Sequence, residues 1–155
     1  MTIVPKLTAT AACRVARIDR DRFNEHVAAG RFPCAPETTP GRARLFDPDD
    51  MIALWLFREH MDDGFDAAHA GRIACSVAEA ARLNPDARSI AYVQDYFGSR
   101  GHAFVADNVP DHSQWDTVLF NDTDIRKVTT YRIGKLREII AHYTDEERSI
   151  IGPND

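Results

Sequence analysis

The chain has 155 residues, 44% of them hydrophobic, which is enough for one compact domain or two small domains with a real core. This composition excludes a chain that is disordered over its whole length. The longest strongly apolar run, Met51–Phe57, is far shorter than the roughly 20 residues of a membrane span. The first six residues also lack the charged and apolar regions of a secretory signal. We therefore expect a soluble, cytoplasmic protein that does not associate with a membrane.

The net charge of −5 is distributed unevenly along the chain. Residues 1–46 carry eight Lys and Arg against four Asp and Glu, a net charge of +4, whereas residues 47–89 and 90–155 carry −5 and −4. Contacts with DNA phosphates depend on the local field rather than on the total charge. The distribution therefore suits a protein that presents one basic, N-terminal face to DNA.

The three cysteines, Cys13, Cys34 and Cys75, are odd in number and widely spaced. They form no Cys-x-x-Cys pair and have no histidine at ligand spacing, so we expect reduced thiols and no metal site. No other cofactor is indicated. Because Cys34 lies beside the segment that predicts a wing, a ligand- or redox-responsive switch at this residue stays open.

Two short helices are predicted at the start of the chain. Thr8 and Asp19 are good N-cap residues, for a first helix over residues 8–16 and a second over residues 19–29. Gly30 directly follows the second helix and is typical of a C-terminal stop. The second helix has one apolar stripe and one polar face.

The next segment changes character. Prolines and glycine between residues 33 and 41 exclude a helix, and Arg42–Phe46 predicts a short strand, so a wing or β-hairpin is expected. Asp47 followed by Pro48 is a strong helix start, and helical spacing continues to Asp63-Gly64.

A fourth helix is predicted over residues 67–82, with a stripe of alanines that indicates tight packing. Asn84-Pro85-Asp86 ends it and predicts a boundary between a domain over residues 1–84 and another over residues 85–155. In the second domain the predicted strands span residues 89–97, 102–106, 117–120 and 127–131, with a turn at residues 98–101 and a helix over residues 132–143. This part predicts a small α+β unit.

Several residues carry a resemblance to the MerR family of transcription regulators. They are Thr8 at the first helix, Gly30-Arg31-Phe32-Pro33 after the second, Gly41-Arg42-Ala43-Arg44-Leu45-Phe46 in the wing, Asp49-Asp50-Met51 at the third helix, and Gly64-Phe65 before the fourth. Residues 8–81 resemble the winged helix-turn-helix domain of that family. The fold class expected from the resemblance and the strand pattern together is mainly α, a winged helix-turn-helix followed by the α+β unit.

The resemblance implies a sequence-specific, double-stranded-DNA-binding transcription regulator. Its second helix would lie in the major groove and its wing would follow the backbone or the minor groove. The DNA-binding residues that it implies are Arg14, Arg17, Arg20, Arg22, Asn24, Arg42 and Arg44. A homodimer on an inverted repeat is expected, located with the nucleoid, with RNA polymerase as a possible partner. The chain departs from the family at Phe23-Asn24-Glu25-His26, where Leu-Arg-Tyr-Tyr is common.

Alternatives remain open at this point. Phage excisionases and packaging subunits have similar winged domains, and a protein–protein adaptor could use the same fold. The basic residues would then be an ordinary solvated surface. No nucleophile elbow, phosphate loop or His-Glu-x-x-His motif is present, so an enzyme is not expected.

Overall fold

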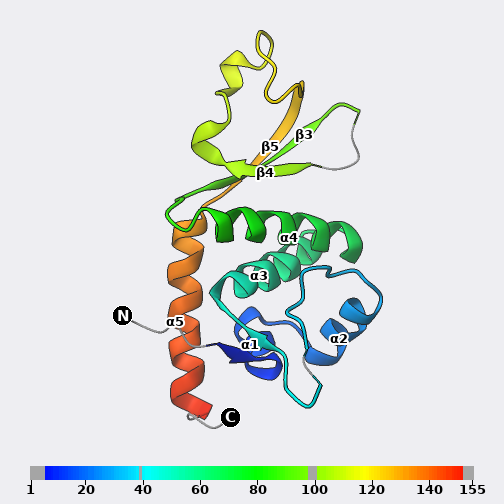
Figure 1. Cartoon of the computed structure of the whole chain (residues 1–155), viewed down its shortest axis with the longest axis vertical. Helices are drawn as coiled ribbons and strands as arrows, with labels where there is room; N and C mark the ends of the chain where they lie inside the picture. The colour runs from blue at the N-terminus through cyan, green and yellow to red at the C-terminus, as the bar shows by residue number, and fades with distance from the viewer. Residues whose placement is uncertain (1–5, 39, 98–100, 152–155) are drawn as a thin grey trace.

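The computed structural model describes residues 6–38, 40–97 and 101–151, with nothing described of the side chain of Ile151. The chain is about 52% helical with a small sheet of three antiparallel strands and a separate antiparallel pair of two short strands, so the fold is a mixture of helices and strands. Figure 1 shows the sheet at one end of the long axis and the first two helices toward the other end. Most of the predicted turn at residues 98–101 lies outside the described residues.

The first two helices are those that the cap residues predict. Helix α1 spans Ala9–Ala16 and helix α2 spans Arg20–Ala28. The Thr8 side chain accepts a hydrogen bond from the Ala11 amide, and the Asp19 side chain accepts one from the Arg22 amide. These bonds satisfy amides that the first turn of a helix leaves without a partner.

The segment that the sequence predicts as a wing does not form a β-hairpin. Strand β2 covers only Leu45–Phe46, and it pairs antiparallel with strand β1, Leu7–Thr8, from the start of the chain. Residues 31–38 and 40–44 contain no strand. The prolines and glycine of this segment prevent a regular ladder, and the predicted strand at Arg42–Phe46 is wrong except for its last two residues.

Helices α3, Pro48–Asp62, and α4, Ala67–Leu83, pack closely against each other and form the centre of the molecule. Asp47 and Asp50 form a reciprocal capping box at the start of α3. Arg82 of α4 donates to the Asp47 carboxylate at 2.7 and 3.1 Å and to Asp50 at 3.0 Å. This ion-pair cluster joins the end of one helix to the start of the other.

The sheet has the order β4-β3-β5, with all pairs antiparallel. Strand β3 spans Ile90–Asp95, β4 spans His102–Val105 and β5 spans Ile125–Tyr131, in agreement with three of the four predicted strands. The predicted strand at Thr117–Phe120 is wrong. This segment follows two short 3₁₀ turns, Ala106–Asn108 and His112–Gln114, and contributes only an isolated bridge between Phe120 and Thr123.

The last helix, α5, returns to the helical half. It spans Ile133–Ile151, so it extends well beyond the predicted end at Tyr143, and it packs against α1 and α3. A single hydrophobic core runs from Leu7 through α1, α3 and α4 to Ile90 in the sheet and Ile140 in α5. His60 of α3 and Tyr131 of β5 add a polar contact between the two halves, with 2.7 Å between Nε2 and the hydroxyl.

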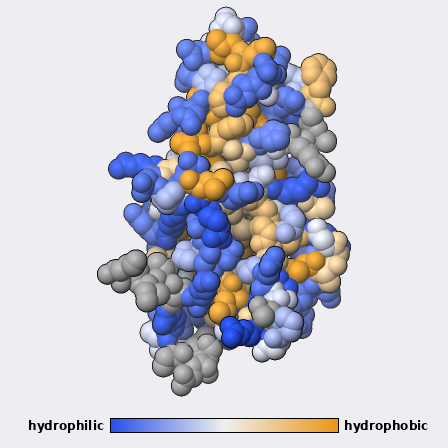
Figure 2. Space-filling view, viewed as in Figure 1, coloured by the Kyte–Doolittle hydropathy of each residue, from blue (hydrophilic) through white to orange (hydrophobic). Residues whose placement is uncertain are grey.

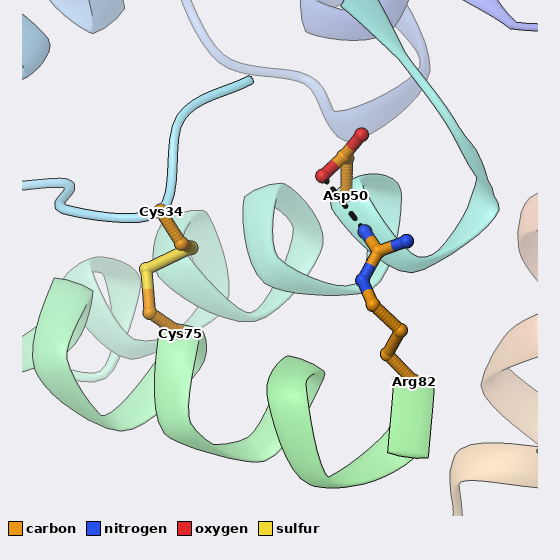
Figure 3. Close-up of a disulfide and its surroundings, with 4 residues drawn as sticks. All are labelled: Cys34, Asp50, Cys75 and Arg82. Atoms are coloured by element: carbon orange, nitrogen blue, oxygen red, sulfur yellow. Dashed lines mark hydrogen bonds and ion pairs between the residues drawn. A yellow bond between two sulfur atoms is a disulfide. The ribbon is translucent and has the colours of Figure 1, made fainter. Parts of the chain in front are cut away.

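Two of the three cysteines are not reduced, contrary to the prediction. Cys34, after α2, and Cys75, in α4, form a disulfide with 5.6 Å between their Cα atoms (Figure 3). Cys13 is a free, buried thiol in α1. The prediction failed because a separation of 41 residues says nothing about proximity, which the fold alone creates.

Among the residues described, no helix combines the length and the hydrophobicity that crossing a bilayer requires.

Candidate nucleic-acid interface

Helices α1 and α2 are joined by a tight turn of three residues. Arg17 adopts a left-handed conformation with φ of 61°, and its amide donates to the carbonyl of Arg14. The next amide, of Ile18, donates to the Cys13 carbonyl at 3.0 Å, and Asp19 then caps α2. A turn with this hydrogen bonding fixes the direction in which α2 leaves α1.

An aromatic cluster holds α2 on the body of the molecule. Phe23 is only 1% exposed, and its ring lies 5.2 Å from the ring of Phe32 and 5.9 Å from that of Phe46. The Phe32 ring in turn lies 5.0 Å from that of Phe57 in α3. Because Phe23 is the single fully buried side chain of α2, the rest of this helix faces outward or lies at its edges.

The outward face of α2 is mixed in charge. Arg22 and Asn24 are exposed there, as the sequence predicts, and so are Asp21 and Glu25. Carboxylates repel phosphates but can accept a hydrogen bond from the amino group of cytosine, and an asparagine side chain can pair with adenine. This set of groups is therefore better suited to reading base edges than to neutralising the DNA backbone alone.

Beside α2 lies a surface hollow of about 430 Å³ with a surplus of cations. Arg17, Arg22 and Arg58 line it, together with the carboxylates of Asp19 and Asp62. Both carboxylates have partners within the chain: Asp19 caps α2, and Asp62 accepts from Arg58 at 2.9 Å. Within the described part of the chain, the side chains of Arg17 and Arg22 form no ion pair, so the hollow can receive an anion.

His26 lies at the edge of the same hollow, where burial and cationic neighbours act on its pKa. Its Nδ1 accepts a hydrogen bond from Nε of Arg31 at 2.9 Å. Burial lowers the pKa of His26, and the charges of Arg31 and Arg22 lower it further, with a smaller opposing effect from Glu25. His26 is therefore neutral at neutral pH and adds no charge to the hollow.

Helix α5 lies alongside two of the predicted DNA-binding residues. Nε of Arg14 is 2.5 Å from a carboxylate oxygen of Glu147, and the guanidinium of Arg17 lies 5.6 Å from the centre of the Tyr143 ring. Arg14 is thus neutralised within the chain. Arg17 keeps its charge, because a cation over an aromatic face is attracted but not neutralised.

The remaining predicted residues are Arg20 at the start of α2 and Arg42 and Arg44 in the wing segment. Arg20 donates to the hydroxyl of Thr10 in α1 at 2.8 Å. Arg42 is exposed in the wing segment, whereas Arg44 is half-buried and donates to the carbonyl of Pro36, closing that segment on itself. Arg42 is therefore the wing cation most available to a ligand.

Three contributors to this surface were not predicted from the sequence. Arg58 lies on α3, and its guanidinium reaches back to the carbonyl of Ala16 at 3.0 Å. Tyr143 and Glu147 come from a helix more than 115 residues away from α1 in sequence. The Arg58-Asp62 spacing indicates a helical ion pair, but no local signal indicates which surface these side chains join.

No protein-family model matches the chain, and no curated protein matches its sequence. Its function is therefore inferred from geometry and charge.

Proposed function

We propose that this chain is a sequence-specific, double-stranded-DNA-binding regulator whose residues 8–81 form a MerR-like winged helix-turn-helix. The observation that carries the proposal is the arrangement of α1 and α2. Two short capped helices meet at a three-residue turn, and the second helix is anchored by Phe23 and exposes Arg22 and Asn24. This is the arrangement with which a recognition helix enters the major groove.

The charge distribution supports a division of roles between the hollow and the outward face of α2. Arg17 and Arg22 beside the hollow would bind a phosphate, which positions the helix but carries no sequence information. Asn24 and Glu25 on the outward face would contact bases, which supplies specificity. Arg42 in the wing would add a second phosphate contact.

The pairing of β1 with β2 supports the assignment of a wing. It ties the start of α1 to the residues just after the wing segment, with Leu7 opposite Phe46 and Thr8 opposite Leu45. The wing segment is thereby held beside the helix-turn-helix although it lacks a hairpin. A reduced wing of this kind would contact DNA through a loop.

Selection from a pool of random DNA duplexes, using the full chain, tests the proposal. We expect one sequence to be enriched, with two-fold symmetry if a homodimer binds it. Asn24→Ala should relax the enrichment at particular positions, whereas Arg22→Ala and Arg42→Ala should weaken binding to all sequences alike.

Arg132→Ala is the matched control, because Arg132 is an exposed arginine at the start of the C-terminal helix. It should leave both affinity and enrichment unchanged. A pool without any enriched sequence, or equal losses in Arg42→Ala and Arg132→Ala, would contradict the proposal.

We also propose a homodimer formed through residues 85–155. Large hydrophobic side chains reach the surface there, with Phe97 96%, Leu119 66% and Tyr96 59% exposed. Figure 2 shows hydrophobic residues at the surface toward the sheet end of the molecule. Light scattering of the full chain should give twice the monomer mass, and Phe97→Ser should lower it. A monomer at all concentrations would refute the dimer.

A further inference from the structure

The disulfide is attached to the wing segment at a position where few other contacts hold it. This segment comprises residues 33–38 and 40–44. On one side Phe32 anchors the chain in the core, and on the other side β2 pairs with β1. Between these two anchors the Cys34–Cys75 bond joins the segment to α4.

Other polar contacts of the wing segment are internal. The bond from Arg44 to the carbonyl of Pro36 closes the segment on itself. In the described part of the chain, no hydrogen bond or ion pair joins it to another helix or strand. Cys34 and Ala35 also pack partly against the core. The disulfide is therefore the covalent link that holds the middle of the wing segment on α4.

The disulfide also faces a pocket. Cys34 and Cys75 both line a cavity of about 630 Å³, with Arg72, Ser76 and Arg82 from the same face of α4. Figure 3 shows the disulfide and the Arg82–Asp50 contact along one side of α4. A pocket of this size admits a small organic molecule. The carboxylates of Asp49, Asp50 and Glu79 line it as well, and Arg82 is paired with the first two, so the access of a reductant depends on the space beside the disulfide rather than on charge.

We propose that the Cys34–Cys75 disulfide is a thiol–disulfide exchange site that takes a dithiol reductant and controls the position of the wing. This inference rests on the proposed DNA-binding function. A thiolate of the dithiol attacks Sγ of Cys34, the more exposed of the two residues, and Cys75 leaves as a thiolate that then takes up a proton. The second thiol of the reductant displaces Cys34 from the mixed disulfide. Two electrons and two protons pass to the protein, and the dithiol becomes a disulfide.

Native labelling tests access to the site. The full chain is treated with dithiothreitol without denaturant, then alkylated with iodoacetamide and analysed by mass spectrometry. We expect adducts on Cys34 and Cys75 but not on Cys13, which is 2% exposed and whose pKa is raised to about 11 by burial. Labelling of Cys34 and Cys75 only after denaturation would overturn the proposal.

Hydrogen exchange tests the effect on the wing. Reduction should accelerate amide exchange in residues 33–38 and 40–44 and leave the amides of α3 unchanged. The double variant Cys34→Ser/Cys75→Ser should reproduce the reduced state, and Cys13→Ser should behave as the oxidised wild type. Should the double variant fail to fold, the comparison of oxidised with reduced wild type still decides. Equal exchange of the wing segment in both states would overturn the proposal.

Fluorescence anisotropy with one labelled duplex of mixed sequence connects the site to DNA. Reduction should lower the log–log salt slope of binding by about 0.9, the contribution of one phosphate contact from Arg42. Binding with the same affinity and slope in both states would overturn control of the wing. If neither state binds the duplex, the proposed function is refuted, and the exchange data decide the redox site by themselves.

Discussion

Gly71 lies in the middle of α4, where the carbonyl of Arg31 comes against the helix. A Cβ atom at this position would lie 1.8 Å from the Arg31 oxygen and 3.0 Å from its carbonyl carbon. Gly134, near the start of α5, is a matched control, because a Cβ there would be 3.7 Å from the backbone of Arg88, an ordinary contact distance. The substitutions Gly71→Ala and Gly134→Ala therefore introduce the same methyl group into a closed and an open site.

Two opposing effects set the expected magnitude. Alanine is favoured over glycine within a helix by about 1 kcal/mol. At position 71 the helix and the backbone of Arg31 must separate by more than an ångström, and overpacking of this kind costs about 1–3 kcal/mol. Because neither atom is the end of a flexible side chain, we expect the higher part of that range and a net destabilisation of about 1–2 kcal/mol.

Urea unfolding followed by circular dichroism measures the difference. Gly71→Ala should unfold at lower urea with an unchanged m-value, and Gly134→Ala should unfold at the same or higher urea. In a thermal scan, each kcal/mol corresponds to a shift of about 2–4 °C for a chain of this size. A Gly71→Ala protein as stable as Gly134→Ala would refute the close contact between the Arg31 backbone and α4.

Three further predictions concern the contacts that hold the helices together. Arg82→Ala should destabilise the fold by about 1 kcal/mol, because Arg82 binds three carboxylates at the start of α3, and Arg72→Ala on the same helix should have little effect in the same urea assay. Burial, opposed by hydrogen bonding, raises the pKa of Asp50 to about 6 from an ordinary 3.8, so its contribution to stability is complete below pH 3.8 and is lost as the pH rises through about 6. In thermal scans between pH 3.8 and about 6, the Tm of Asp50→Asn should fall less with rising pH than that of wild type. Parallel curves of Tm against pH would contradict the raised pKa of Asp50. Phe23→Ala should lower the free energy of unfolding by about 3–5 kcal/mol, because this buried side chain anchors α2. The exposed neighbour gives the control, since Asn24→Ala should lower it by less than about 0.5 kcal/mol. Similar losses in the two variants would show that aromatic contacts do not hold α2.

The helices of the first half could be predicted well because their signals are local. The N-caps Thr8, Asp19 and Asp47 each accept the expected backbone hydrogen bond, and Gly30 follows α2 with φ of 75°. Such caps act within four residues of the chain and need no tertiary partner. The strands β3, β4 and β5 were likewise indicated by their β-branched and aromatic residues.

The wing and the disulfide could not be predicted because they depend on distant segments. Strand β2 pairs with residues 7–8 rather than with a neighbouring strand, and Cys34 meets Cys75 only because the wing segment lies on α4. The segment Thr117–Phe120 has the composition of a strand but pairs only through an isolated bridge between Phe120 and Thr123. Composition favours a strand, and pairing decides whether one forms.

The sequence indicated which types of residue the candidate site contains, but not which of them the fold brings together. Arg22, Asn24 and Arg42 are exposed as expected, but Glu147 of α5 neutralises Arg14, and Arg44 is bound to the wing's own backbone. A sequence shows that arginines are abundant in the first 46 residues. It does not show which of them the fold has already paired.

The salt dependence of DNA binding tests the central claim most directly. Anisotropy of a labelled duplex, taken from the selection experiment, is measured with wild type, Arg22→Ala/Arg42→Ala and Arg132→Ala over a series of salt concentrations. If α2 and the wing each bind a phosphate, the double variant should lose about 1.8 from the log–log slope, at about 0.9 per phosphate, while Arg132→Ala keeps the wild-type slope. Wild-type binding that does not depend on salt, or a double variant with the wild-type slope, would contradict the assignment of this surface to DNA.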